Sequence, residues 1–209
     1  MLESLLAFLA VSVLVIVTPG PDTALLIRNT LMGGARGGVF TALGVVFGQL
    51  IWAFATSLGL VALLIASEPL FLALKYLGAA YLVLLGAQAL WAALRSREEQ
   101  VVALRRDARQ LARASFRQGL ISDLGNPKMA MFFASLLPQF VPGGEASFVA
   151  LMGLGALFAA LAFLWLSFYA LTLARLGQFL RSSTVRRTLE AITGTVLVAL
   201  GLRLALEER

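Results

Sequence analysis

The chain contains no cysteine and no histidine among its 209 residues. The lack of cysteine excludes disulfides, thiol redox chemistry and cysteine metal ligands. The lack of histidine leaves carboxylates as the groups for any proton relay. Charged residues make up only 13% of the chain, against about 25% in a soluble domain. Hydrophobic residues reach 60% and the mean hydropathy is +0.90, which indicates an all-α integral membrane protein.

Further function classes are excluded by what the sequence does not contain. The formal net charge of +6 does not indicate nucleic-acid binding, because the basic residues are confined to a few loops. No nucleophile with its partners, no metal constellation and no phosphate-binding loop is found, so neither an enzyme nor a cofactor is expected. The start of the chain lacks the basic region of a signal peptide, so we expect its first apolar segment to stay in the membrane.

Apolar runs of about 20 residues or more can cross a bilayer. They predict six transmembrane helices, near 2–31, 38–66, 70–94, 115–141, 147–174 and 186–206. Residues 95–114 form a polar linker between a first three-helix repeat, 1–94, and a second, 115–209. A duplicated unit of three spans must insert its second copy upside down, so we expect inverted repeats. A five-span arrangement, in which the first run turns back to the cytoplasmic side, gives the same loop charges and is the alternative.

Basic residues set the expected orientation. Seven arginines lie between residues 95 and 117, and further basic residues follow the first and fifth runs. By the positive-inside rule the 95–114 linker is cytoplasmic and both termini lie outside. Residues 101–113 place apolar side chains at helical spacing, which suits an amphipathic helix on the membrane surface. A solvated basic loop is an equally good interpretation of the same residues.

Prolines interrupt the first and fourth expected spans. The first break is Thr18-Pro19-Gly20-Pro21-Asp22, and the second contains Asp123 and Asn126-Pro127-Lys128. A helix broken at membrane depth has to line protein or a watery cavity, and an ionisable residue beside the break is a functional-site hypothesis. We therefore expect the two breaks to face one another near mid-membrane, with Asp22 and Lys128 lining one cavity.

Each break also has a structural interpretation. Free carbonyls before the first break suit an ammonium, and the N–H groups after it suit a carboxylate. Alternatively, Asp22 and Thr23 are simple helix caps at a kink. Lys128 is either a counter-ion for Asp22, a receptor for a substrate carboxylate, or half of a structural ion pair whose disruption costs about 3–5 kcal/mol.

Two amide side chains complete the candidate site. Gln49 lies in the second expected span and Gln139 near the end of the fourth, beside Pro138. Both can contact a polar solute, although interhelical hydrogen bonds are a common structural use of glutamine in membranes.

These motifs resemble those of the lysine exporter and homoserine/threonine resistance (LysE/RhtB) family of bacterial amino-acid exporters. The resemblance rests on Thr18-Pro19-Gly20-Pro21, Leu77-Gly78-Ala79-Ala80-Tyr81-Leu82 through Gly86, Phe116-Arg117-Gln118-Gly119, and Asn126-Pro127-Lys128 continuing to Phe132-Phe133 and Leu137-Pro138-Gln139-Phe140. It implies a secondary exporter of amino acids or related zwitterions in the cytoplasmic (inner) membrane, coupled to protons and assembled as a homodimer. The family site residues that carry over are Pro19, Gly20, Pro21, Asp22, Asn126, Pro127 and Lys128.

Two other functions fit the residues. A carrier or channel for another small solute or ion has the same fold but shows no competition by amino acids. A non-transport membrane assembly factor shows no flux. The resemblance does not identify the amino acid.

Overall fold

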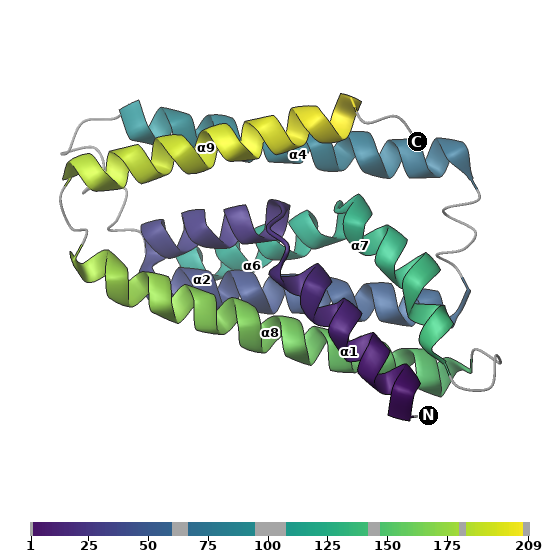
Figure 1. The fold of residues 1–209 in the computed structure, drawn as a ribbon. Helices are drawn as coiled ribbons and strands as arrows, with labels where there is room; N and C mark the ends of the chain where they lie inside the picture. The colour runs from purple at the N-terminus through teal and green to yellow at the C-terminus, as the bar shows by residue number, and fades with distance from the viewer. Residues whose placement is uncertain (1, 60–66, 95–107, 142–146, 180–182, 207–209) are drawn as a thin grey trace.

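The structure is a computed structural model of the chain, and it describes residues 2–59, 67–94, 108–141, 147–179 and 183–206 (Figure 1). Within these ranges the regular structure is helical and contains no strand, as the sequence predicts. The elements are α1 (Leu2–Val17), α2 (Pro21–Ser57), α4 (Glu68–Leu94), α6 (Ala108–Leu124), α7 (Pro127–Met131), the π-helix η1 (Phe132–Leu136), the 3₁₀-helix η2 (Leu137–Phe140), α8 (Phe148–Phe179) and α9 (Ser183–Leu206).

Helix α2 is a hairpin of two antiparallel limbs, residues 21–33 and 35–57, that are joined at Gly34. Gly34 has φ +62° and ψ −160°, a left-handed φ that favours glycine. The side chain of Asn29 donates a hydrogen bond to Thr41 Oγ1 at 2.9 Å. In a straight helix these two residues would lie about 18 Å apart, so the hydrogen bond requires the chain to reverse between them. The reversal falls between the first two spans expected from the sequence.

The helices form two layers (Figure 1). Helix α4 packs against α9 in one layer, and α2 packs against α6 and α8 in the other. Glycines permit the close approach of α4 and α9, since a Cβ at Gly86 would come within 2.7 Å of the carbonyl oxygen of Gly194. Small residues at such contacts are typical of membrane helices. Each pairing joins a helix of the first expected repeat to one of the second, so the two halves interlock.

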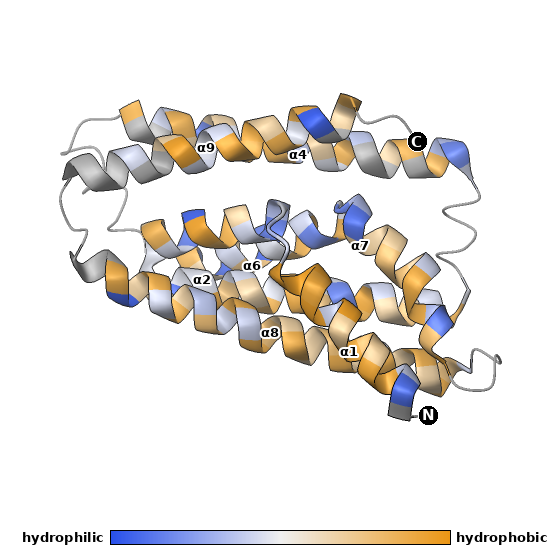
Figure 2. Cartoon of the chain, viewed as in Figure 1, coloured by the Kyte–Doolittle hydropathy of each residue, from blue (hydrophilic) through white to orange (hydrophobic). Residues whose placement is uncertain are grey.

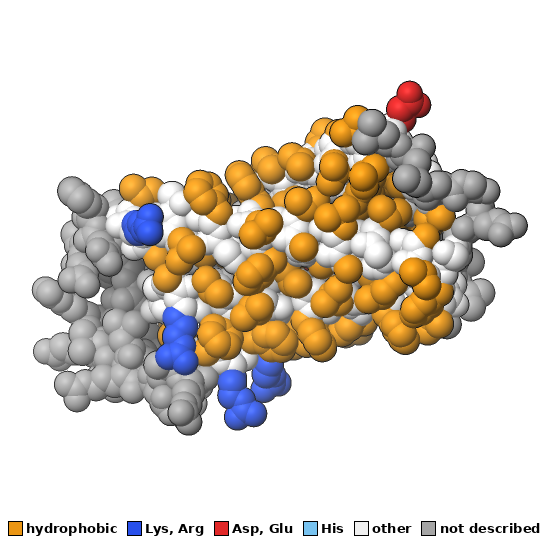
Figure 3. Space-filling view, turned by 90° about the horizontal axis from the view of Figure 1, so that it is seen from below, with side chains coloured by type: hydrophobic (Ala, Val, Ile, Leu, Met, Phe, Trp, Pro, Cys, Tyr) orange, Lys and Arg blue, Asp and Glu red, His pale blue; other side chains and the backbone are white. Residues whose placement is uncertain are grey.

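The surface between the two ends of the molecule is apolar. Hydrophobic side chains cover it on the face shown in Figure 3, and large ones such as Leu14, Val149 and Phe168 are more than half exposed. By length and composition, Pro21–Ser57, counted across the reversal at Gly34, and Phe148–Leu176 are long and apolar enough to cross a membrane, and Glu3–Val17, Tyr76–Trp91 and Ala191–Arg203 are shorter apolar helices. This surface suits contact with lipid chains, which takes up exposed apolar side chains without cost.

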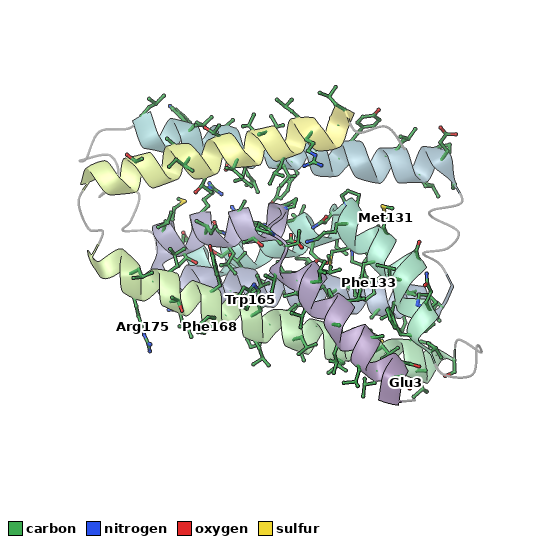
Figure 4. The ribbon with its side chains drawn as sticks, in the orientation of Figure 1. Glu3, Met131, Phe133, Trp165, Phe168 and Arg175 are labelled. Atoms are coloured by element: carbon green, nitrogen blue, oxygen red, sulfur yellow. The ribbon has the colours of Figure 1, made fainter. Side chains whose placement is uncertain are left out.

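The two ends of the molecule differ in the charge of their side chains. Glu3 of α1 and Arg175 of α8 lie at opposite ends of the molecule (Figure 4). The turn at Gly34 and the start of α6 lie together, because a side chain at Gly33 would meet Leu111. Among the side chains visible in Figure 3, Lys and Arg lie towards one end, and the acidic side chain lies at the other. On the face shown in Figure 3, the apolar bundle therefore carries basic residues towards the end that holds Arg175.

Two boundaries differ from the expected ones. Helix α6 begins at Ala108, so residues 108–114 belong to this helix and not to a separate linker. Residues 95–107, and with them most of the expected surface helix 101–113, lie outside the described residues. After the second break the chain does not form one regular helix, because α7 passes into a π-turn and then a 3₁₀-turn. Pro138 favours this change, since a proline has no N–H for an α-helical hydrogen bond.

Candidate functional site

The two helix breaks meet at Asp22. Its side chain, at the start of α2, is 9% exposed and accepts hydrogen bonds from two residues of the second break region. Ser122 Oγ donates to Asp22 Oδ1 at 2.6 Å, and Asn126 Nδ2 donates to Oδ2 at 2.9 Å. Hydrogen bonds to a charged acceptor are short and strong, so they fix the carboxylate between the halves of the chain. Hydrophilic residues interrupt the apolar helices beside the break before α7 (Figure 2).

Asn126 and Lys128 organise the second break. Asn126 is the N-cap of α7, and its Oδ1 accepts a hydrogen bond from the backbone N–H of Lys128 at 3.0 Å. Pro127 occupies the first turn, where its missing N–H costs nothing. The Lys128 ammonium reaches across to α1 and donates to the carbonyl oxygens of Val15 and Thr18, at 3.2 and 3.3 Å. These are the carbonyls that the first break leaves without helical partners.

The interpretation of Asp22 as a helix cap is wrong. The N-cap of α2 is Gly20, with no side-chain cap, and Pro21 follows it. The Asp22 carboxylate is turned instead to Ser122 and Asn126. Its partners lie on another helix, so its role is tertiary rather than local. Lys128 hydrogen-bonds to α1 and is not joined to Asp22 by a direct contact.

A small cavity of about 20 Å³ opens beside these groups. Its polar walls include Asp22, Thr23, Gln49 and Lys128, and Gly20 also lines it. The remaining lining is apolar and comes from α1, α2, α7 and α8, namely Val15, Ile16, Val45, Met129, Phe158, Ala162 and Leu166. A negative and a positive side chain therefore share one apolar cavity without neutralising each other directly. Opposite charges held apart in this way complement a small molecule that carries both charges, although the cavity as it stands has room for about one water molecule.

Asp123 lies behind the cavity and is fully buried. It packs on Gly48 so closely that a side chain at position 48 would overlap it. The indole N–H of Trp52 donates to its backbone oxygen at 3.2 Å. The oxygens of its carboxylate accept no hydrogen bond of normal length, and the Gln49 side chain, whose own Oε1 is buried without a partner, lies beside them as a weak donor. The second carboxylate of the site thus has an environment unlike that of Asp22.

Two other predicted residues, Gln139 and Pro19, do not line the cavity. Gln139 lies outside the cavity, where it is exposed and donates to the carbonyl of Ser135 at 2.7 Å. Pro19 is exposed within the first break. Ser122 was missed by the sequence argument, because a serine in an apolar helix has no pattern that separates a ligand-facing position from a packing one.

No group of three or more acidic residues that can hold a metal ion is present in the described parts of the chain.

The sequence of the chain matches one family model and several known proteins. The family model described as LysE type translocator matches residues 13–208. The membrane protein YrhP of Bacillus subtilis (strain 168), itself uncharacterized, is 30% identical over 209 residues, which cover 98% of this chain and 100% of the relative. The leucine efflux protein of Salmonella typhimurium is 34% identical over 138 residues, 64% of this chain and 61% of the relative. No solved structure matches the chain significantly.

Proposed function

The chain belongs to the LysE type translocator family, which consists of transporters and not of enzymes, and on this premise we propose that it exports amino acids across the bacterial cytoplasmic membrane, driven by the proton gradient. The observation that carries the proposal is the shared cavity of Asp22 and Lys128, in which the two charges face the same space without pairing. A zwitterion is the ligand that complements such a pair.

We propose that each charge binds one end of the zwitterion. The substrate ammonium faces Asp22, whose carboxylate is already held in place by Ser122 and Asn126. The substrate carboxylate faces Lys128 and the start of α2, where Gly20 provides no side-chain cap. Uncapped N–H groups and the positive end of the helix dipole attract an anion.

The rest of the cavity favours an apolar side chain on the substrate. Phe158, Ala162 and Leu166 of α8 form one wall and carry no polar side-chain atom. Burial of an apolar side chain there contributes about 25 cal/mol for each Å² removed from water. We therefore propose an amino acid such as leucine, which the leucine efflux proteins among the relatives also support.

The cavity as it stands has room for about one water molecule. An amino acid therefore needs a more open conformation, and we propose that the structure corresponds to a closed step of the transport cycle. We propose that the two three-helix units are inverted repeats whose interlocked helices rearrange around the paired breaks. Assembly as a homodimer is part of the same proposal, and the mass of the purified protein in detergent tests it.

The distribution of charge predicts the orientation of the protein in the membrane. Basic ends of membrane proteins stay on the cytoplasmic side, so we propose that the end with Arg175 is cytoplasmic and that both termini lie outside. Cysteines introduced at Ser96 and Ser147 test this orientation in intact cells with an impermeant reagent. Labelling at Ser96 but not at Ser147 would reverse it.

The charge assignment is tested by exchanging the two charges. Asp22→Asn and Lys128→Gln should each abolish export of preloaded labelled leucine while folded protein stays in the membrane. The double exchange, Asp22→Lys with Lys128→Asp, should also be inactive, because each charge then faces the wrong end of the substrate. Arg175→Gln, an exposed change far from the cavity, is the matched control. Near-normal export by the double exchange, normalised to folded protein, contradicts the substrate-binding role.

A further inference from the structure

The two carboxylates of the site differ in their hydrogen bonding. Asp22 accepts two hydrogen bonds, whereas the carboxylate of Asp123 is fully buried and accepts none of normal length. Gln49 lies beside Asp123 on the second limb of α2, and its own Oε1 is buried without a partner. The Gln49 amide is therefore at most a weak donor to the Asp123 carboxylate. Burial of an ionised carboxylate without hydrogen bonds is very unfavourable.

Protonation of the Asp123 carboxylate supplies a hydrogen-bond donor at this buried site. A protonated carboxyl group carries one O–H donor, which can be given to Gln49 Oε1 and so satisfies both residues. The charged side chains that face Asp123 are Asp22 on the first limb of α2 and Lys128 on α7. Trp52 and Gln49, which face it from the second limb, are neutral.

We infer that Asp123 binds the proton that couples transport to the gradient, while Asp22 stays ionised and binds the substrate ammonium. The inference rests on the proposed function and adds a division of roles between the two acids. A substrate ammonium at Asp22 brings a positive charge near Asp123, which favours the ionised form of a neighbouring carboxyl group. The proton then leaves to the cytoplasmic side. After the substrate has been released outside, a proton from that side returns to Asp123.

Proteoliposomes separate the two roles, with L-leucine as the probe. Counterflow without a pH gradient measures substrate binding and exchange, and uptake driven by an acidic interior measures coupling. We expect Asp123→Asn to keep counterflow and to lose all gradient-driven accumulation. Asp22→Asn should lose both activities. Glu68→Gln neutralises an exposed carboxylate and is the matched control, which should behave as wild type in both assays.

A second measurement does not depend on flux. Addition of L-leucine to the protein in weakly buffered detergent should release protons from wild type and Glu68→Gln, but none from Asp123→Asn. Asp123→Ser, which keeps a hydroxyl donor for Gln49, serves as a second neutral variant if the asparagine variant folds poorly.

Each outcome has a distinct meaning. Gradient-driven accumulation by folded Asp123→Asn overturns the assignment of the proton to Asp123, as does loss of counterflow in both neutral variants while they remain folded. Leucine accumulation by the wild-type protein that is driven by a sodium gradient and not by a pH gradient overturns it as well. Absence of counterflow in wild type contradicts the proposed function itself.

Discussion

The two helix breaks differ in how their backbone N–H and carbonyl groups find hydrogen-bond partners. At the break between α1 and α2, the carbonyls of Val15 and Thr18 accept from Lys128, and the next helix starts at Gly20 without a side-chain cap. At the break before α7, Asn126 caps its own helix through the N–H of Lys128. The second break is thus complete in itself, whereas the first depends on the second for its donor.

This difference assigns separate tasks to the two breaks. The first supplies backbone acceptors, an uncapped helix start and the Asp22 carboxylate, which are all groups that a ligand can contact. The second supplies the side chains that hold them, since Asn126 serves both the α7 cap and Asp22. A site built of irregular backbone needs such support, because unsatisfied polar groups are costly inside a membrane. The comparison predicts that side-chain changes at the second break disturb both breaks.

The largest effect is expected from Asn126→Ala. The change removes the cap of α7 and one of the two donors to Asp22, and the two losses together should cost about 2–4 kcal/mol. Thermal unfolding in detergent measures the effect. Gln139→Ala removes an exposed amide with a local hydrogen bond and is the matched control. If both variants unfold at the same temperature, Asn126 does not hold the two breaks together.

A much smaller effect is expected from Gly20→Ala at the first break. Gly20 has φ −151° and ψ −166°, an extended conformation that alanine also adopts. A Cβ there would lie 3.5 Å from Lys128 Nζ, an ordinary contact. We expect the free energy of unfolding to change by less than about 1 kcal/mol, while the added methyl group narrows the cavity and raises the half-saturation concentration of counterflow. A large loss of stability would show that this break, too, is fixed by close packing.

The breaks themselves were predictable from sequence because the effect of proline on a helix is local. Pro21 and Pro127 each stand in the first turn of a new helix, at the positions expected. The expectation that the breaks face one another agrees with the hydrogen bond between Asn126 and Asp22. The helical segments were recognisable for a similar reason, since long apolar runs in a membrane have few alternatives to a helix.

Side-chain partners were less predictable, since they depend on helix rotation and register. Gln139 was expected near the site, but a π-turn and a 3₁₀-turn separate it from Lys128, and both change the number of residues per turn. Counting residues along a regular α-helix therefore does not predict where the side chain of Gln139 lies. Lys128 has Asp22 and the free α1 carbonyls within its range as alternative partners, and only the three-dimensional arrangement shows that it takes the carbonyls. The substrate-binding and coupling roles of these residues stay predictions.

The hydrogen bonds of Asp22 also bear on how the protein is made. Its two partners, Ser122 and Asn126, follow it by 100 and 104 residues in the chain. At a synthesis rate of about 5–20 residues per second, Asp22 leaves the ribosome roughly 5–20 s before either partner exists. During this interval the first half of the chain lacks the groups that make its carboxylate tolerable in lipid. Insertion of the first three segments and completion of the polar centre are therefore separate events in biogenesis, and the second waits for the arrival of α6 and α7.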